Sequence, residues 1–518
     1  GTYMMDMVYV PCLARNRNKE IACFMREKAY TVNDGGTLFY KREYLEKPEY
    51  GEELKEILKE FILRYEGSAD GERNLDYYHR FSENNKPVGT YDIRIVNRIM
   101  ATVPFFTMFG VPYIYDNGVY IEDPDGIRLK AMIQEYIMPQ FIKSSTISSI
   151  YQLLITQAGL SRQYYEINNH PKHWINFRNG WFDPVEQKMY DHDPKYYSVN
   201  QIPFDFDMKW LDAEPSGEIT EEYLKTSRPD EADRKMFWQY LGYCMTVDTG
   251  FQKFLMIKGR GGTGKSVLVS IFQHIIGMQN MASISLQNLN QRFYATGLFG
   301  KLINACADIP GTALENVDVI KKAVGEDTLL YERKGMDATH FRSYAKLLFS
   351  ANELPLNLDE KSNAYYRRLM ILTMNTSPVN KDMKLKDKIC AETPYIITKA
   401  VKALTGLYKD GCFAESERSR MCVEELHRAA DTIKAFLDAK IEKSPGKKIY
   451  RAKMYEAYKE YCEAEERSAH KKTSFFQLME DKGYSLKRDK DGFYYDGVDF
   501  ADGGFMSIDD YDGELPFK

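Results

Sequence analysis

The sequence predicts a multidomain α/β protein whose central domain is built on a parallel β-sheet. The first observation is a strand, a loop and a helix in succession: the apolar run 253–258, the glycine-rich loop 259–266 and the apolar-periodic segment 267–272. The second is a pair of apolar runs, 302–308 and 345–352, that each end in a polar residue, which is typical of buried parallel strands. The third is the length, since 518 residues exceed one ordinary domain.

The composition is that of a globular protein, with 44% hydrophobic and 28% charged residues. The net charge of −5 at pH 7 gives no overall basic signature, so any surface for nucleic acid has to be local. The 8 cysteines include no C-x-x-C pair and no histidine at zinc spacing, which indicates reduced, buried thiols in a cytosolic protein. No apolar run has transmembrane length and no signal peptide is found, so we expect a soluble protein without a membrane partner. Residue 1 is a glycine, which favours a native start further upstream.

The glycine-rich loop has the spacing G-x-x-x-x-G-K-S of a phosphate-binding P-loop. Glycines let successive backbone N–H groups turn toward an anion, and the following helix adds the positive end of its dipole. We expect Lys265 to reach the β- and γ-phosphates of a nucleotide and the Ser266 hydroxyl to hold Mg²⁺. Average residue usage predicts only about 0.02 chance matches in such a chain. The residues expected to line this site are Gly259, Gly261, Gly262, Thr263, Gly264, Lys265 and Ser266.

The segments that precede the loop form a polar region and then a mixed one. Residues 1–88 are polar and charged, with one amphipathic helix expected over 52–65 and a boundary at 84–89. Beyond it, Asn117 and Gly118 between β-formers predict a hairpin with a type I′ turn over 113–121. The other elements expected here are helices over 127–141, 147–158 and 230–243 and a second hairpin over 174–183.

Polar residues that flank the later apolar runs are candidates for catalysis. Asp308 ends its run at the edge where open α/β sheets bind ligands, and its place after a P-loop favours a Walker B role at Mg²⁺ over a turn-capping aspartate. Asn352 ends the next run and could orient the attacking water. Arg367 and Arg368 stand directly before an apolar strand. They are either a solvated pair or an arginine finger that acts in trans, because a planar cation stabilises charge on a γ-phosphate.

Two basic regions are candidates for binding nucleic acid. Residues 329–341 alternate, turn at Lys334 and Gly335 and alternate again, which predicts a hairpin with cations at its tip. Near the C-terminus, helices expected over 433–441, 449–462 and 473–483, followed by a strand, turn and strand over 484–495, suggest a winged-helix domain; a solvated charged face on a small helical domain is the alternative. The cations that could hold duplex phosphates there are His470, Lys471, Lys472, Lys487, Arg488 and Lys490.

Taken in order, these motifs resemble the superfamily 3 helicases of viruses and mobile elements. Residues 113–120 and 177–183 look like the helicase-preceding domain of the phage, plasmid and poxvirus primase-helicase family. The resemblance implies an AAA+-like P-loop ATPase core with a parallel sheet, a mostly helical α+β domain before it and a winged-helix-like domain after it. Similar proteins form hexameric rings that hydrolyse ATP with Mg²⁺ and pull single-stranded DNA through the centre.

The resemblance also implies roles for individual residues. Lys265 and Ser266 match the Walker A pair, and Asp308 matches the Walker B acid. Asn352 matches sensor 1, and Arg367 or Arg368 matches the finger. The residues that match the family's third motif and pore hairpin are Lys321, Arg333, Lys334 and His340.

Two features are left open at this point. Many family members carry two adjacent acids at the Walker B end, but Ala307 precedes Asp308 here, so the general base is either Asp308 itself or a contribution from Glu315. The acidic run 509–518 is typical of a disordered tail. It also looks like the acidic Leu-Pro-Phe ending of bacterial single-stranded-DNA-binding proteins, which docks replication factors, although Lys518 follows the phenylalanine here.

The combined prediction is an ATP-dependent DNA helicase for replication of a phage or mobile element in a bacterial cytoplasm, acting as a hexameric ring on single-stranded and forked DNA. Primase or other replication proteins are expected partners, since no segment before Tyr91 has the spaced carboxylates of a primase. The alternatives are an origin-binding initiator that uses ATP for assembly and melting, and a P-loop ATPase that acts on protein. The expected partition is an accessory region 1–88, a helicase-preceding domain 89–228, a motor 229–400, a helical linker 401–430, a winged-helix-like domain 431–498 and an acidic tail 499–518.

Overall fold

The computed structural model describes residues 75–501 except 229, 315, 336, 358–362, 378–381 and 468. Nearer the N-terminus it describes only three strands, β1 (Met7–Val10), β2 (Thr31–Val32) and β3 (Leu38–Lys41), which form a sheet in the order β1-β3-β2. The helix expected over 52–65, Glu315 and the acidic run 509–518 lie outside the described residues. The chain divides into two compact units: 1–169 with 193–199, and 170–192 with 200–518.

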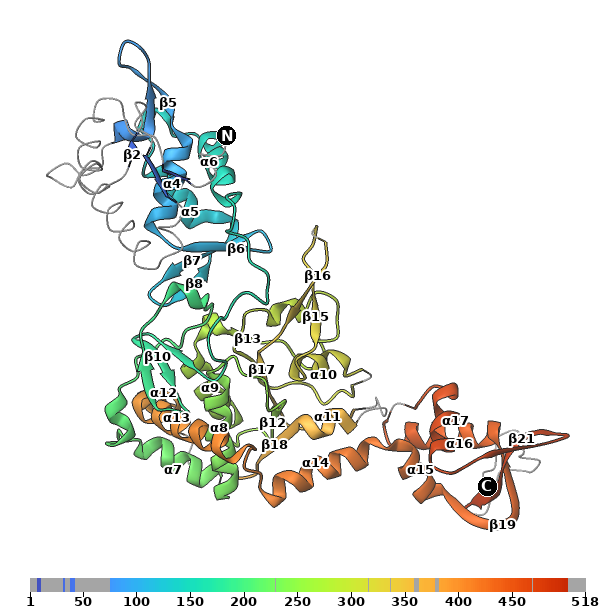
Figure 1. Ribbon diagram of the computed structural model, residues 1–518. Coiled ribbons are helices and arrows are strands. Elements are labelled where there is room, and N and C mark those ends of the chain that lie inside the picture. The colour runs from blue at the N-terminus through green and yellow to red at the C-terminus, as the bar shows by residue number, and fades with distance from the viewer. Residues whose placement is uncertain are drawn as a thin grey trace. The chain divides into compact units, whose positions relative to one another are not determined.

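In its described part, the first unit combines short antiparallel sheets with the α-helices α4, α5 and α6 (Figure 1). Its core is formed by α4, α5 and α6, with residues such as Ile95, Leu129 and Ile150 fully buried. Its elements are η3 (Leu75–Tyr78), β4 (His79–Phe81), β5 (Pro87–Thr90), α4 (Asp92–Thr102), β6 (Phe105–Met108), β7 (Val111–Asp116), β8 (Val119–Glu122), η4 (Pro124–Gly126), α5 (Ile127–Gln134), η5 (Pro139–Phe141), α6 (Ser144–Ile155) and η6 (Pro194–Tyr196).

The first hairpin prediction is confirmed, and one helix prediction is partly wrong. β7 and β8 pair antiparallel across Asn117 and Gly118, whose φ angles of 46° and 94° are those that a type I′ turn needs. The helix expected over 127–141 ends at Gln134 instead. Met138 has ψ 143°, because a residue before proline is pushed out of the helical region, and Pro139 then starts a separate 3₁₀ turn.

The second unit contains a five-stranded parallel sheet in the order β13-β14-β17-β12-β18, which confirms the predicted α/β class and parallel sheet. Its strands are β12 (Phe254–Gly259), β13 (Met281–Ala282), β14 (Ile303–Cys306), β17 (Lys346–Ala351) and β18 (Leu369–Met374). An antiparallel sheet of β9 (Ile175–Phe177), β10 (Gly180–Asp183) and β11 (Lys188–Tyr190) precedes them and confirms the second hairpin.

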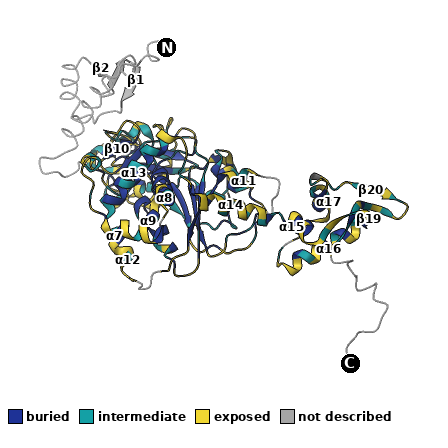
Figure 2. Cartoon of the chain, turned by 90° about the horizontal axis from the view of Figure 1, so that it is seen from below, coloured by how far each residue is buried: buried dark blue, intermediate teal, exposed yellow. Residues whose placement is uncertain are grey.

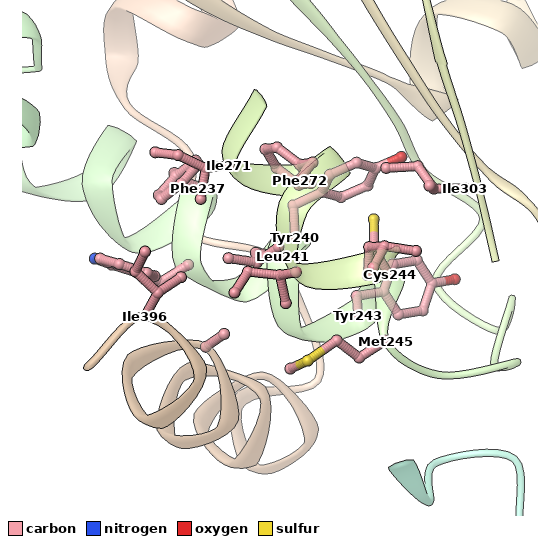
Figure 3. Close-up of a cluster of buried hydrophobic side chains, with 14 of the residues drawn as sticks. Phe237, Tyr240, Leu241, Tyr243, Cys244, Met245, Ile271, Phe272, Ile303 and Ile396 are labelled. Carbon is pink, nitrogen blue, oxygen red and sulfur yellow. The ribbon is translucent and has the colours of Figure 1, made fainter. Parts of the chain in front are cut away.

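Helices pack against the parallel sheet. Leu255 and Ile257 of β12 belong to one apolar core with α8, α9 and α13, and Figure 2 shows buried residues concentrated in these elements. Aromatic side chains of α8 pack against Phe272 of α9 in this core (Figure 3). At the edge strand β18, the Ser419 hydroxyl of α14 donates to the Ile371 carbonyl. The helices and the remaining hairpin are η7 (Met208–Leu211), α7 (Glu218–Ser227), α8 (Glu231–Cys244), α9 (Lys265–Ile276), η8 (Met278–Asn280), η9 (Ala295–Leu298), α10 (Asp318–Val324), β15 (Thr328–Tyr331), β16 (Thr339–Arg342), α11 (Asn363–Arg368), α12 (Leu385–Cys390), α13 (Thr393–Asp410) and α14 (Glu417–Ala430).

The C-terminal segment has a hydrophobic core of its own, formed by residues such as Phe436, Tyr458 and Phe475. Its elements are α15 (Thr432–Lys440), β19 (Ile441–Tyr450), α16 (Arg451–Ala464), α17 (Lys472–Asp481), β20 (Leu486–Asp489) and β21 (Gly492–Phe500). The three predicted helices are confirmed, but the sequence missed β19, which pairs with β21. Its middle carries Pro445, Gly446 and lysines around an irregularity between Lys443 and Lys448, so no period-two apolar pattern marks it as a strand.

Two further expectations can be compared with the described residues. Among their cysteines, Cys244 and Cys462 are buried, but Cys412 is exposed in the turn after α13, so the expectation of buried thiols is wrong there. None of the helices in the described part of the chain is long and apolar enough to cross a membrane.

Candidate nucleotide-binding site

The P-loop has the predicted strand, loop and helix, because β12 ends at Gly259 and α9 begins at Lys265. Gly264 has φ 88°, a left-handed conformation that favours glycine, and it caps α9. A Cβ at Gly259 would lie 2.4 Å from the carbonyl oxygen of Met374, so the close approach of β18 requires glycine there as well. The chain thus turns tightly at the carboxyl end of β12 and directs the N-terminus of α9 at the turn.

The Lys265 ammonium group lies at the mouth of this loop. The residue is only 5% exposed. Its Nζ donates to the carbonyl oxygens of Gly259 and Arg260, at 2.6 and 3.0 Å, and to Asn352 Oδ1 at 2.8 Å. All three acceptors are uncharged. The charge of Lys265 is therefore held in place and is not neutralised by a carboxylate.

The other loop residues are of two kinds: some stabilise the loop through hydrogen bonds, and others are exposed to solvent. Thr263 is buried and its hydroxyl donates to the Arg260 carbonyl at 2.8 Å, so it braces the loop. Ser266, in the first turn of α9, is exposed, and a Cβ at Gly261 would meet no atom within 4 Å. The Ser266 hydroxyl is the open polar group that a ligand or a metal could reach.

Asp308 and Asn352 stand at the same carboxyl edge of the sheet. β14 pairs with β17 and β17 pairs with β12, all in parallel, so the residues that follow these strands meet beside the P-loop. Asp308 is exposed, has φ 51°, and its N–H donates to the Ser350 hydroxyl at 3.1 Å. The carbonyl of Ser350 also accepts a hydrogen bond from the Ile309 N–H at 2.9 Å. Ser350 was missed from the sequence; its only signal is a place two residues before Asn352 on one strand.

The residues at this edge fit a nucleotide-bound magnesium ion better than a resident metal. Within the described residues, no group of three or more His, Cys, Asp and Glu side chains is placed to hold a metal ion. Mg²⁺ usually takes one or two carboxylates together with substrate phosphates and water. The exposed Asp308 carboxylate and Ser266 hydroxyl supply ligands of that kind.

Arg367 and Arg368 lie at the opposite edge of the sheet. They precede β18, whose residues pair with β12 from Phe254 opposite Leu369 to Gly259 opposite Met374. Six residues of strand span about 20 Å, so neither arginine can reach the P-loop of its own chain. The sequence interpretation left the two equivalent, and their surroundings separate them.

The two arginines differ in burial and in bonding. Arg368 is 8% exposed and donates to the Ala364 carbonyl at 2.9 Å and to Gln252 Oε1 at 3.4 Å. Burial, and then the charge of Arg367, lower the pKa of Arg368. Arg367 is exposed, and its backbone carbonyl accepts a hydrogen bond from Lys253 Nζ at 2.6 Å. Arg368 is therefore part of the fold, whereas the Arg367 side chain faces outward.

The predicted basic hairpin is confirmed as a strand pair, β15 with β16. Leu329, Tyr331 and Phe341 are buried on one side, and Phe299 packs edge-on against the two aromatic rings. His340 is exposed, as are Arg333 and Lys334 at the turn, and the Arg333 guanidinium lies 5.3 Å from the centre of the Tyr331 ring. The sequence interpretation missed Arg342, which is exposed at the end of β16. Lys321, in α10, forms an ion pair of 2.9 Å with Asp318.

The C-terminal cations are not equivalent. Lys471 and Lys472 are exposed at the start of α17. Lys487 instead forms an ion pair with Asp496 at 2.6 Å, which raises the pKa of Lys487, and the Arg488 guanidinium lies 5.3 Å from the Phe493 ring centre. Lys471 and Lys472 are therefore open at the start of α17, whereas the charge of Lys487 is paired.

Comparisons with known proteins match parts of the chain. Residues 124–245 match the family described as "D5 N terminal like", and residues 257–368 match the "Family of unknown function (DUF5906)". The "Uncharacterized mitochondrial protein ymf21" of Marchantia polymorpha is 24% identical over 125 residues, which is 23% of this chain and 69% of that protein. The first match agrees with the resemblance to phage-type primase-helicase replication proteins, and the second carries no assigned function.

Solved structures resemble the chain only distantly. "The A form apo structure of NrS-1 C terminal region-CTR" is 13% identical, covers 77% of this chain and 98% of that chain, and has a TM-score of 0.42. A second structure, titled with residues 305-718 of the same region, is 13% identical, covers 79% of this chain and 100% of that chain, and has a TM-score of 0.43.

Proposed function

We propose that this protein is an ATP-dependent DNA helicase of the superfamily 3 type, built on an AAA+-like core and acting in the replication of a phage or other mobile element. The observation that carries the proposal is the bond from Lys265 Nζ to Asn352 Oδ1, beside the exposed carboxylate of Asp308. It joins the P-loop to the end of another strand at one sheet edge, where a γ-phosphate and its attacking water have to meet.

Each residue of this site has a separate role in the proposed hydrolysis of ATP. Lys265 exchanges its neutral acceptors for phosphate oxygens, which are stronger partners because the bonds become charge-assisted. Ser266 and Asp308 would hold Mg²⁺, which would supply positive charge to the phosphates. Asn352 orients the attacking water. Asp308 is the described candidate for the general base; Glu315 is the other candidate from the sequence.

The position of the arginines supports a site shared between copies of the chain. Arg367 is exposed at the edge about 20 Å from its own P-loop, so it can stabilise a γ-phosphate only in a neighbouring subunit. A closed ring, which we propose to be a hexamer, gives every P-loop such a neighbour.

The hairpin β15–β16 is the proposed DNA contact of the ring. Arg333, Lys334 and His340 are exposed on it, and Arg342 adds a further cation. Repeated around one axis, these side chains would bind phosphates of single-stranded DNA without sequence preference, in spite of the net charge of −5.

The test is hydrolysis and unwinding by the wild type and Lys265→Ala. We expect the variant to lose hydrolysis and the unwinding of forked DNA, assayed with 3′ and 5′ tails. Lys409→Ala, which removes an exposed lysine at the end of α13, is the matched control and should behave as the wild type. Equal hydrolysis by the wild type and Lys265→Ala would exclude this site as the source of activity.

An origin-binding initiator is the second candidate, and the C-terminal domain favours it. Its order of helices and strands is that expected of a winged helix, and Lys471 and Lys472 stand exposed at the start of α17 beside Thr473 and Ser474. A footprint on one duplex sequence would support the initiator. Uniform affinity across sequences, together with DNA-stimulated hydrolysis, would support the motor; hydrolysis indifferent to DNA would favour an ATPase that acts on protein.

A further inference from the structure

The direction in which a nucleotide lies across the P-loop follows from the order of the strands. Lys265, Asn352 and Asp308 mark the end of the site where the γ-phosphate is placed, and the latter two follow β17 and β14. β18 lies on the other side of β12. The nucleoside half of the same ligand therefore extends toward the carboxyl end of β18.

At that end, α7 touches the P-loop. The Tyr223 hydroxyl donates to the Gly264 carbonyl at 2.9 Å. A Cβ at Gly264 would lie 3.3 Å from this hydroxyl and 3.7 Å from Cε of Met374, the last residue of β18. The C-terminal half of α7 thus lies beside the loop on the side that faces the nucleoside.

Arg228, which caps the C-terminus of α7, is a buried cation that is 2% exposed. Among the described residues, neither its Nε nor its Nη2 has a hydrogen-bond partner. The nearby Asp233 accepts the Ser416 hydroxyl at 2.6 Å and forms no ion pair with Arg228 among the described residues. Burial lowers the pKa of Arg228 to about 10, so it remains charged at neutral pH.

Such an arrangement is costly in a folded protein unless a ligand completes it. A buried polar donor without a partner destabilises the folded protein, and a charged donor does so more strongly. A guanidinium has donors only and presents them in a fixed planar fork, so the missing partner must offer acceptor oxygens or nitrogens.

We propose that Arg228 is a nucleotide-binding residue whose Nε and Nη2 donate to acceptors on the ribose or the base. This inference rests on the proposed nucleotide-hydrolysing function. The phosphates have their own partners in Lys265 and the loop N–H groups. Arg228 follows directly after α7 and lies close enough to Tyr223 for the two side chains to interact electrostatically. Because Tyr223 contacts Gly264, this place beside the loop suits the nucleoside half.

The experiment compares the dissociation constants of ATP, dATP, GTP and inorganic triphosphate for the wild type, Arg228→Met and Arg178→Met. Methionine keeps the apolar stem of the side chain and removes the charge. Arg178, exposed and paired with Asp205 at 3.4 Å, is the control. We expect Arg228→Met to weaken ATP binding about 10- to 100-fold, the effect of losing charge-assisted hydrogen bonds, and to leave triphosphate binding unchanged.

The remaining ligands locate the contact. A smaller loss for dATP than for ATP assigns it to the ribose, and different losses for ATP and GTP assign it to the base. Thermal unfolding without nucleotide gives a second readout: Arg228→Met should be as stable as the wild type or more stable, because it removes an unpaired buried charge.

Two results would overturn the inference. The first is unchanged ATP affinity in Arg228→Met; together with a lower melting temperature without nucleotide, it would make Arg228 a structural residue. The second is an equal loss of affinity for ATP and for triphosphate. A wild type that binds no nucleotide at all would overturn the proposed function as well, so the two failures are distinguishable.

Discussion

The two edges of the parallel sheet hold their charged side chains in different ways. At the carboxyl edge, Asp308 and Asn352 are exposed, and Lys265 is bound by acceptors that a phosphate can replace. At the amino edge, Arg368 and Lys346 are buried and bound by backbone carbonyls of neighbouring segments. The carboxyl edge therefore keeps groups that can change partners, and the amino edge uses its charges to hold the fold together.

Arg367 is the exception at the amino edge, and it links the two edges. Its side chain is exposed while its carbonyl is fixed by Lys253. If one chain's amino edge meets another chain's carboxyl edge, as a head-to-tail ring requires, Arg367 completes the neighbouring site. The predictions below test this division of the sheet into a chemical edge and a structural edge.

The largest effect is expected for Arg367→Ala. We expect ATP hydrolysis to fall by about 10³-fold, as for the loss of an arginine finger, while ATP affinity is kept. Steady-state hydrolysis and equilibrium binding measure the two. Mixing Arg367→Ala with Lys265→Ala should restore part of the activity, because some interfaces then combine an intact P-loop with an intact finger.

Arg368→Ala is the control for the same edge. Because its guanidinium is bound to Ala364 and Gln252, we expect a lower melting temperature as its first effect. If Arg368→Ala lost hydrolysis without losing stability, and Arg367→Ala did neither, the assignment of the two arginines would be reversed.

Asn352→Ala should have the second largest effect. The variant removes one acceptor of Lys265 and the group that we propose aligns the water, so we expect kcat to fall by about 100-fold with ATP affinity changed little. Asn363→Ala, an exposed asparagine at the start of α11, should leave both quantities unchanged. An equal loss of affinity and of kcat would mean that Asn352 binds the nucleotide and does not act on the transition state.

Much of the carboxyl edge could be predicted from the sequence, because a buried parallel strand is an apolar run and the polar residue that follows it marks its end. Asp308 and Asn352 each stand at the end of an apolar run, and the P-loop motif identifies the strand beside which these two residues are expected. The same logic found Arg367 and Arg368 but could not separate them, since burial depends on α10 and on Gln252, which are distant in the chain.

The residues that were missed depend on tertiary neighbours. Tyr223 lies in an ordinary amphipathic helix and Arg228 caps it, and only the packing of α7 against Gly264 gives these two residues a role. β19 was missed because Pro445 and Gly446 interrupt it, and its pairing with β21 outweighs local propensity. The end of α5 depended on the extended conformation that Pro139 imposes on Met138.

The buried lysine of the amino edge should make stability depend on pH. Burial lowers the pKa of Lys346 to about 8, below its ordinary value of 10.5, and the neighbouring Cys244 and Asp248 oppose this shift. Between these values the unfolded chain binds more protons, so stability gains from this group as pH rises from about 8 to 10.5. We expect the free energy of unfolding of the wild type to rise relative to Lys346→Met by about 1–3 kcal/mol over this range.

Urea unfolding at several pH values between 7 and 10 measures this difference. The comparison with Lys346→Met cancels the contributions of other titrating groups, including the tyrosines that ionise at the upper end. Parallel curves for the two proteins would show that Lys346 keeps an ordinary pKa in the fold. The charge at the amino edge would then be solvated, and it would not differ from the carboxyl edge in this respect.

The smallest effect is expected for a matched pair of serines. Ser350 lies near the C-terminal end of β17, and Ser343 lies just before its N-terminal end. Ser350 accepts the Asp308 N–H at 3.1 Å at the carboxyl edge, and Ser343 accepts the Ala345 N–H at 3.2 Å at the amino edge; both are buried. Each change to alanine removes one hydrogen bond, worth about 1 kcal/mol, so both variants should lose similar stability. Only Ser350→Ala should also lower kcat, by about 5-fold. The hydrogen bond to Ser350 helps to hold the backbone of Asp308 in its left-handed conformation, so its loss would position the carboxylate less well. Equal kcat values in the two variants would mean that the backbone of β17 alone positions Asp308, and that the difference between the edges lies in exposure and not in how the groups are held.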